Sequence, residues 1–437
     1  MAPEFVPGLR LAREFCGAVV RPLLAEMFPR LEYAAALLGP GSEVAGFDTQ
    51  RSTDHDWGPR LQIFLTDSDS ARHAGPVTAM LASRLPATFR GYPVAFPVTR
   101  EPDGTARHRV EVTGLGTWLT SRLGFDPRHA VTLLDWLATP AQRLAEITTG
   151  EVFHDGPGEL SRAREELAWY PRDVWLYVLA CQWQRIGQEE PFPGRCAEAG
   201  DDLGSVLVTA RLARDVMRLC LLMHRRYPPY SKWLGTAFAR LPGTVALTAS
   251  LTAAVSAGGW PAREEHLCEA HETVALMHNE LGLTPPLDTR KRRFYDRPYQ
   301  VIGAGRFADA LGQAITDPRI GNLSLTGAID QFIDSTDAVG ELRFLRACAA
   351  AATAERQPRA VRLSLTCWSP PDLAAGAAGA NRCEPRRPGR WSSQGCGLLP
   401  TRTHRDRRTR RRFHPSLPGP PGGRWCRRPA RPRPAGR

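Results

Sequence analysis

Residues 39–65, GPGSEVAGFDTQRSTDHDWGPRLQIFL, hold the densest group of chemically informative residues in this 437-residue chain. The apolar run 33–38 precedes them and predicts a buried strand that leads into a tight turn at Gly41 and Ser42. The run 61–65 at the other end predicts a second strand. The stretch therefore predicts two strands joined by a polar connection.

Carboxylates are the chemical feature of this connection. Asp54 and Asp56 are two residues apart, so in extended backbone both side chains would point to one face. A third carboxylate, Glu111, lies in the middle of the predicted strand 107–113. Mg²⁺ prefers a few carboxylate oxygens and leaves positions open for water and phosphates. The Gly41–Ser42 turn offers backbone N–H groups and a hydroxyl to a triphosphate.

The order of these residues resembles the nucleotidyltransferase superfamily that includes polymerase β and the aminoglycoside nucleotidyltransferases. The stretch is also similar to an uncharacterised bacterial family of domain-of-unknown-function proteins, which carry GSE…GFD…DHDWGPR and a PYSKW-like segment, here residues 229–233. The superfamily resemblance implies magnesium-dependent transfer of a nucleoside monophosphate from a nucleoside triphosphate to an acceptor hydroxyl. ATP is the expected triphosphate. The nearer family implies no substrate.

The superfamily resemblance also implies a role for each candidate residue. Asp54, Asp56 and Glu111 are the expected catalytic residues and metal ligands. Glu111 would act as general base on the acceptor hydroxyl. Gly41 and Ser42 are expected to bind the triphosphate.

Lysine is scarce in this chain, with Lys232 and Lys291 as its only two examples. Lysine and arginine differ in geometry and hydration, so a lysine kept in an arginine-rich chain indicates a need for a compact ammonium group. The resemblance to the aminoglycoside enzymes implies that Lys232 contacts the triphosphate from the helical domain. Lys291 lies in the basic run 290–293, which predicts a solvated loop.

Each candidate has a simpler alternative. Asp54 and Asp56 could form an acidic turn ahead of a strand, and Lys232 could be a surface residue at a helix start. Glu111 could be a surface residue that pairs with a nearby arginine. The corresponding alternative for the whole protein is a catalytically inactive nucleotidyltransferase fold that acts as a nucleotide-sensing or partner-binding module.

The remaining periodicity predicts an α+β fold. Residues 8–28 predict a helix, and a shorter helix is expected near 75–84, with Asp67–Asp69 before it as a solvated loop cap. Beyond about residue 115 the strand signal gives way to helical periodicity, most clearly in 203–226. We therefore expect three parts: a small mixed α/β nucleotidyltransferase-like domain, a larger all-helical domain and a disordered tail rich in Arg, Pro and Gly. Their expected ranges are 1–125, 126–366 and 367–437.

Charge is distributed unevenly. The chain carries a formal net charge of +12, but residues 371–437 hold 17 arginines and three acidic residues, which leaves the first 370 residues at −2. The body therefore does not support a nucleic-acid partner. The tail could be a nucleic-acid-binding arm, a functionless extension, or the product of reading a GC-rich gene out of frame. The abrupt loss of Ile, Val and periodicity favours the last explanation.

Other features predict a cytoplasmic protein. No run of about 18 apolar residues predicts a spanning helix, and the start lacks the basic-then-apolar pattern of a signal peptide. The ten cysteines are spread singly without a CxxC pair, which predicts reduced thiols. The expected partners are a nucleoside triphosphate and a small-molecule acceptor, with no membrane.

Overall fold

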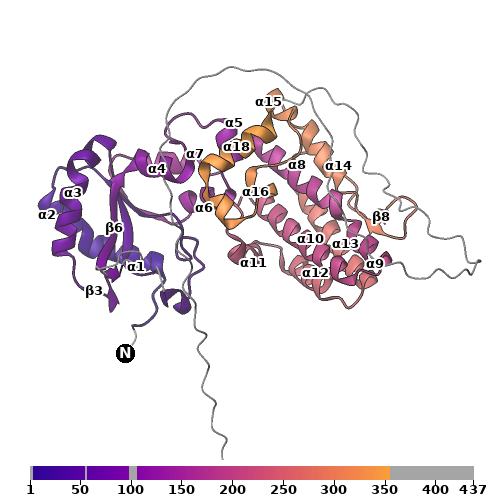
Figure 1. Ribbon diagram of the computed structural model, residues 1–437, viewed down its shortest axis with the longest axis horizontal. Helices are drawn as coiled ribbons and strands as arrows, with labels where there is room; N and C mark the ends of the chain where they lie inside the picture. Colours follow the sequence, from indigo (N-terminus) through magenta and orange to yellow (C-terminus); the bar gives the residue numbers. More distant parts are fainter. Residues whose placement is uncertain (1–2, 55–56, 98–105, 355–437) are drawn as a thin grey trace, which may run out of the picture. The chain divides into compact units, whose positions relative to one another are not determined.

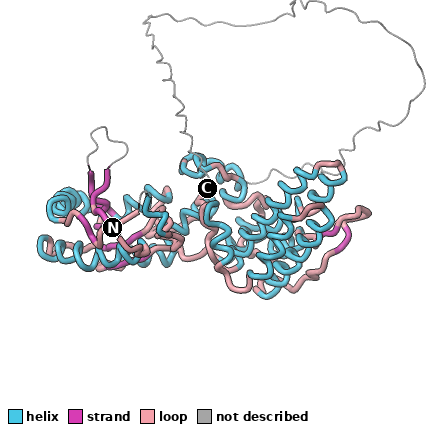
Figure 2. The backbone as a smooth tube through the Cα atoms, turned by 90° about the horizontal axis from the view of Figure 1, so that it is seen from below, coloured by secondary structure: helices cyan, strands magenta, loops and turns pink. Residues whose placement is uncertain are grey.

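The computed structural model describes residues 3–54, 57–97 and 106–354. The compact unit Met1–Arg362 contains all of them. It has the expected α+β fold, with a mixed sheet near the N-terminus and helices through most of the remaining chain (Figures 1 and 2). The expected tail, 367–437, lies outside the described residues.

Five strands form the main sheet in the order β5-β6-β2-β1-β7. β2 and β6 run parallel, and the other neighbours run antiparallel. The strands are β1 (Ala34–Leu37), β2 (Arg60–Leu65), β5 (Ala95–Pro97), β6 (Ala106–Gly114) and β7 (Glu151–Asp155), and a separate pair is formed by β3 (Thr88–Phe89) and β4 (Tyr92–Pro93).

Side chains of β2 alternate between two apolar clusters, as expected for a strand buried on both faces. Leu61 and Ile63 pack with α1, α2 and α3, whereas Phe64 packs with α4. The expected helix 8–28 is confirmed, with a π-helical turn, η1, between α1 and α2. These elements are α1 (Gly8–Phe15), η1 (Cys16–Val20), α2 (Arg21–Met27), α3 (Asp67–Arg84) and α4 (Leu115–Leu123).

Helix α3 begins earlier than the sequence predicts. The Thr66 hydroxyl accepts a hydrogen bond from the Asp69 backbone N–H at 3.0 Å and so caps the helix. Asp67 and Asp69 lie in the first turn, where a negative charge favours the helix dipole. The expectation of a solvated loop at Asp67–Asp69 is therefore wrong, because these acidic residues begin a helix.

The edge strand β7 comes from beyond residue 125, where the expected α/β domain ends, and pairs with β1. Its apolar residues, Val152 and Phe153, are adjacent, so its sequence lacks the alternation of apolar and polar residues by which a strand is recognised. The division of the chain at 125/126 stays a prediction.

Helices make up most of the described residues from Leu133 to 354, apart from β7 and the short β8–β9 pair (Figure 2). α8 packs against α10 and α14, and the rings of Trp183 and Phe307 stack with centroids 4.5 Å apart. Within the described ranges, no helix combines the length and apolar character that membrane crossing requires. The remaining elements are η2 (Gln50–Asp54), α5 (Leu133–Ala138), α6 (Ala141–Thr148), α7 (Glu159–Glu166), α8 (Arg172–Glu189), α9 (Phe192–Glu198), α10 (Asp202–Met223), η3 (Ser231–Trp233), α11 (Leu234–Ala239), α12 (Val245–Ser256), α13 (Trp260–Glu280), β8 (Arg292–Arg293), β9 (Gln300–Val301), α14 (Gly305–Gln313), α15 (Pro318–Gly321), α16 (Ile329–Phe332), α17 (Thr336–Gly340) and α18 (Leu342–Thr353).

A buried histidine makes the helical core sensitive to acid. His278 is 1% exposed, and its Nδ1 accepts a hydrogen bond from Trp183 Nε1 at 3.2 Å. Its Nε2 lies 3.0 Å from the Thr284 hydroxyl. Burial lowers the pKa of His278 to about 4, so the folded state holds this ring neutral.

We predict that acid weakens the fold through this ring. Between about pH 6.5 and pH 4 the unfolded chain binds a proton that folded His278 does not, so stability falls as the pH falls, by about 3 kcal/mol in all. His278→Asn keeps an acceptor for Trp183 and does not titrate. Urea unfolding at a series of pH values measures the free energy of unfolding of both proteins. As the pH falls through this range, the stability of the wild type relative to the variant should decrease. A difference that does not change with pH would contradict the prediction.

Candidate functional site

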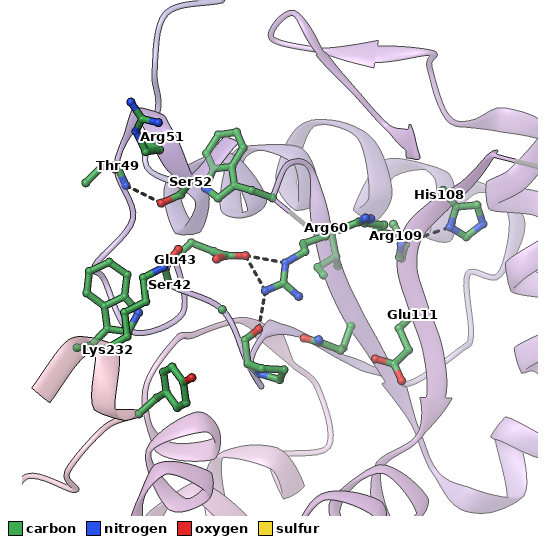
Figure 3. A pocket seen from close by; sticks show the side chains of 18 residues that line it. Ser42, Glu43, Thr49, Arg51, Ser52, Arg60, His108, Arg109, Glu111 and Lys232 are labelled. Carbon is green, nitrogen blue, oxygen red and sulfur yellow. Dashed lines mark hydrogen bonds and ion pairs between the residues drawn. The ribbon is translucent and has the colours of Figure 1, made fainter. Parts of the chain in front are cut away.

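An ion pair between a buried glutamate and a half-buried arginine joins the two ends of the connection between β1 and β2. Glu43, which is 3% exposed, lies just after the Gly–Ser turn, and Arg60 is the first residue of β2. Arg60 Nε and Nη2 donate to Glu43 Oε1 at 2.7 and 2.6 Å. Nη2 also donates to the carbonyl of Pro40 at 2.9 Å (Figure 3). Charge-assisted bonds of this kind hold the turn against the strand.

The same ion pair explains the glycine in the turn. Gly41 has φ +150°, and a Cβ there would lie 2.5 Å from Arg60 Nη2 and 2.7 Å from Glu43 Oε2. A side chain at this position would push the two charged groups apart. Ser42 follows, half-buried, and its hydroxyl makes no hydrogen bond within the described part of the chain.

Hydrogen bonds to Asp48 form a second link within the connection between β1 and β2. Asp48 Oδ2 accepts hydrogen bonds from Trp57 Nε1 at 3.0 Å and from the backbone N–H of Gly8, at the start of α1, at 2.7 Å. Trp57 is 3% exposed and packs edge-on against Tyr92. The connection is therefore tied to both β2 and α1.

Sequence reasoning assigned no role to these four linking residues. The GSE, GFD and DHDWGPR segments contain them, and the structure pairs Glu43 with Arg60 and Asp48 with Trp57. One feature of the sequence could have predicted the Glu43–Arg60 pair: the two residues carry opposite charges and each lies next to an apolar strand.

In the sequence, the expected acidic pair lies between Asp48 and Trp57. Asp54 is the last residue of η2, so its backbone is helical there rather than extended as expected. The Asp54 side chain and the whole of Asp56 lie outside the described residues, and their role as metal ligands stays a prediction. Among the residues that the structure does describe, no group of three His, Cys, Asp or Glu side chains could hold a metal ion.

Glu111 lies on the sheet face that is turned away from α3. Its neighbour Val110 packs into the cluster formed with α3, so Glu111 points to the opposite face, where it is exposed (Figure 3). The parallel register places Glu111 beside Gln62 of β2. Gln62 is buried and bonds the N–H and the carbonyl of Leu38, at 3.0 and 3.2 Å. Gln62 thus connects the strand of Glu111 to the start of the Gly–Ser turn.

Lys232 comes from the helical part of the chain and is exposed. Its ammonium lies 4.9 Å from the ring centroid of Trp233, which stacks on Phe47 at 5.3 Å. Arg240 donates to the carbonyl of Gly46 at 2.8 Å, and its guanidinium lies 4.4 Å from the Phe47 ring centroid. These contacts hold η3 and α11 against the segment that follows the Gly–Ser turn.

The Gly–Ser turn, η2, β2, β6 and η3 line a cavity of about 840 Å³. Four of the six predicted site residues line it, namely Gly41, Ser42, Glu111 and Lys232 (Figure 3). Among the described titratable residues of its lining, basic groups predominate over acidic ones; these residues are Glu43, Arg51, Arg60, His108, Arg109, Glu111, Tyr230 and Lys232.

The chain is similar to two kinds of known protein. A family described as a domain of unknown function (DUF4037) matches residues 136–234, a range that includes Lys232 and begins after Glu111. No curated protein matches the chain. Among solved structures, a nucleotidyltransferase-like protein from Exiguobacterium sibiricum 255-15 is similar over 69% of this chain and 89% of its own, with 10% identity and a TM-score of 0.29. This similarity is distant, and the site geometry does not depend on it.

We predict that the Glu43–Arg60 pair contributes strongly to stability. Glu43→Gln leaves the Arg60 charge largely buried without its partner, which should lower the free energy of unfolding by about 3 kcal/mol. The control is Glu26→Gln, which breaks the exposed Glu26–Arg84 pair and should lower it by about 0.5 kcal/mol. Urea denaturation measures both. Equal losses in the two variants would show that the Glu43–Arg60 pair has no special role.

Proposed function

We propose that this protein is a magnesium-dependent nucleotidyltransferase. It transfers a nucleoside monophosphate from a nucleoside triphosphate, expected to be ATP, to a hydroxyl of a small-molecule acceptor. The observation that carries the proposal is the cavity of about 840 Å³, whose lining includes the Gly41–Ser42 turn, Glu111 and Lys232. The motif resemblance implied these four residues together, and they come from separate elements of the fold.

The lining of the cavity suits a polyanion. Phosphoryl transfer depends mainly on positioning and on neutralising charge, and the triphosphate brings several negative charges. In the proposal, the Gly41–Ser42 turn contacts the phosphates through its N–H groups and the Ser42 hydroxyl, which bonds no other described residue. Lys232, which lines the same cavity, neutralises part of the phosphate charge. Tyr230 lines the same cavity and is 45% exposed, which leaves a ring face on which a nucleobase could stack.

Glu111 is the proposed general base. Its carboxylate is exposed on the cavity side of β6, where it could accept the proton of the acceptor hydroxyl. The acceptor oxygen then forms a bond to the α-phosphorus, the bond between that phosphorus and the bridging oxygen breaks, and pyrophosphate leaves. Pyrophosphate carries away the broken bond's electron pair, so no covalent enzyme intermediate is needed.

Magnesium enters the proposal through the carboxylates. The metal would neutralise phosphate charge and lower the pKa of the attacking hydroxyl. Glu111 is the described carboxylate that projects freely into the cavity, because Glu43 is held by Arg60. Glu111 alone does not make a magnesium site, so the proposal depends on Asp54 and Asp56 for the remaining ligands.

The cavity is also compatible with a second function. A fold with a nucleotide cavity but without three converging carboxylates could bind a triphosphate without turning it over. The protein would then be a nucleotide-sensing or partner-binding module. Release of pyrophosphate separates the two functions, because only the enzyme produces it.

Lysine provides the sharpest test of nucleotide binding. Lys232→Met should weaken ATP binding about tenfold in the presence of magnesium, because one charge-assisted contact to phosphate is lost. The control is Lys291→Met, which removes the other lysine, a residue that does not line the cavity. Asp56→Asn should abolish the dependence of binding on magnesium. Equilibrium dialysis with radiolabelled ATP, with magnesium or with a chelator, measures all three.

The proposal fails if the wild-type protein binds no nucleoside triphosphate in a magnesium-dependent way. It also fails if Lys232→Met and Lys291→Met weaken binding equally. Binding as expected, with no pyrophosphate released in the presence of a cell extract, would favour the sensing module over the enzyme.

A further inference from the structure

A second cavity, of about 670 Å³, lies beside the first one and has no role in the nucleotide site described above. Its walls come from the segment after the Gly–Ser turn, from α6, α7 and α11, and from the end of α10. Much of its lining is apolar, including Phe47, Val152, Leu221 and Leu241. The cavity could therefore hold the apolar body of a small molecule.

Positive charge gathers at this cavity. Four arginines line it against one acidic residue, Glu165, although the first 370 residues of the chain carry a net charge of −2. The arginines are Arg164, Arg225, Arg226 and Arg240. An anionic group is the natural counterpart of this lining, whereas a polycation would be repelled.

Two of the four arginines already have structural tasks. Arg240 binds the Gly46 carbonyl and covers the Phe47 ring. Arg164 donates to the carbonyls of Ile147, Thr148 and Thr149 at the end of α6. Their guanidinium groups are therefore fixed to the protein itself.

The other two arginines are available to a ligand. Arg226 is exposed and makes no ion pair within the described part of the chain. Arg225 is also exposed, and its guanidinium lies 4.5 Å from the ring centroid of Trp175. Stacking on an aromatic ring holds a guanidinium in place while leaving its N–H edge open to an anion.

The backbone of Arg225 adds an independent observation. Arg225 has φ +52° and follows the C-cap of α10, where glycine is the favoured residue. Its N–H donates to the Leu222 carbonyl, and the N–H of Arg226 donates to the Leu221 carbonyl. The chain keeps an arginine in a left-handed conformation there, and this places the side chain at the cavity.

A smaller cavity of about 290 Å³ adjoins both of these cavities. It shares Gly41, Ser42 and Tyr230 with the nucleotide cavity, and Ala45 and Pro229 with the second cavity. A molecule in the second cavity could therefore extend a hydroxyl toward the Gly–Ser turn.

We infer that the second cavity binds the acceptor, and that this acceptor is a small molecule with an apolar body and a phosphate or carboxylate group held by Arg225 and Arg226. The inference rests on the proposed function, because it assigns the second substrate of that reaction. It disfavours polycationic acceptors, which the resemblance alone leaves open.

Model anions test the inference with the full-length protein. Phenyl phosphate and phenylacetate share an aromatic body with the uncharged phenol, and isothermal titration calorimetry measures the binding of each. Both anions should bind at least about tenfold more tightly than phenol. Arg226→Gln should weaken phenyl phosphate binding about tenfold. Arg211→Gln changes an exposed arginine on α10 that pairs with Glu189 and does not line the cavity, so it should leave binding unchanged.

Arg225→Gly separates binding from stability. Glycine relieves the left-handed conformation while the stacking on Trp175 is lost, so these opposing effects should keep the melting temperature within about 2 °C of wild type. Affinity for phenyl phosphate should still fall about tenfold. A purely structural role for Arg225 would instead lower the melting temperature and leave affinity unchanged.

The outcomes distinguish this inference from the proposed function. If ATP binds with magnesium but phenyl phosphate does not bind, or binds no better than phenol, the inference fails and the nucleotide site stands. Equal loss of phenyl phosphate affinity in Arg226→Gln and Arg211→Gln also overturns it. If phenyl phosphate binds at the arginines but no triphosphate binds, the proposed function fails, and the assignment of an acceptor fails with it.

Discussion

The ion pair between Glu43 and Arg60 is the interaction on which the site depends. It joins the Gly–Ser turn to the first residue of β2 and so closes the connection in which the predicted acidic residues lie. The pair excludes any side chain larger than hydrogen at Gly41. Separating the two partners would leave a poorly solvated charge. The conformation in which the pair joins the two ends of the connection is therefore the stable one.

The helical part of the chain completes the site through aromatic and arginine contacts. Trp233 stacks on the ring of Phe47, a few residues beyond the turn, and the Arg240 guanidinium lies over the same ring. These contacts place Lys232, the neighbour of Trp233, at the cavity. The same segment lines the arginine-lined cavity through Ala45 and Phe47. One short stretch of chain after β1 therefore shapes the binding places that we propose for both substrates.

The strands and the site residues differed in how well the sequence predicted them. β1 and β2 were predictable from apolar runs and β6 from its alternating pattern, whereas the sequence of β7 shows neither. Gly41, Ser42, Glu111 and Lys232 were chosen from the motif order and from the scarcity of lysine, and all four line one cavity. The sequence did not predict a role for Arg225 and Arg226. That role depends on the contact between Arg225 and Trp175 and on a left-handed backbone at Arg225, and neither leaves a recognisable pattern in the sequence. The pairings of Glu43 and Asp48 were missed for the same reason.

A crystal structure with Mn²⁺ and a non-hydrolysable ATP analogue tests the central claim most directly, because Mn²⁺ replaces Mg²⁺ and is located by its anomalous scattering. Our account predicts the phosphates against the Gly41–Ser42 turn, with Lys232 in contact with them. It also predicts a Mn²⁺ peak about 2–2.5 Å from a carboxylate oxygen of Glu111. A nucleotide bound elsewhere on the protein, or phosphates at the turn with no metal near Glu111, would contradict it.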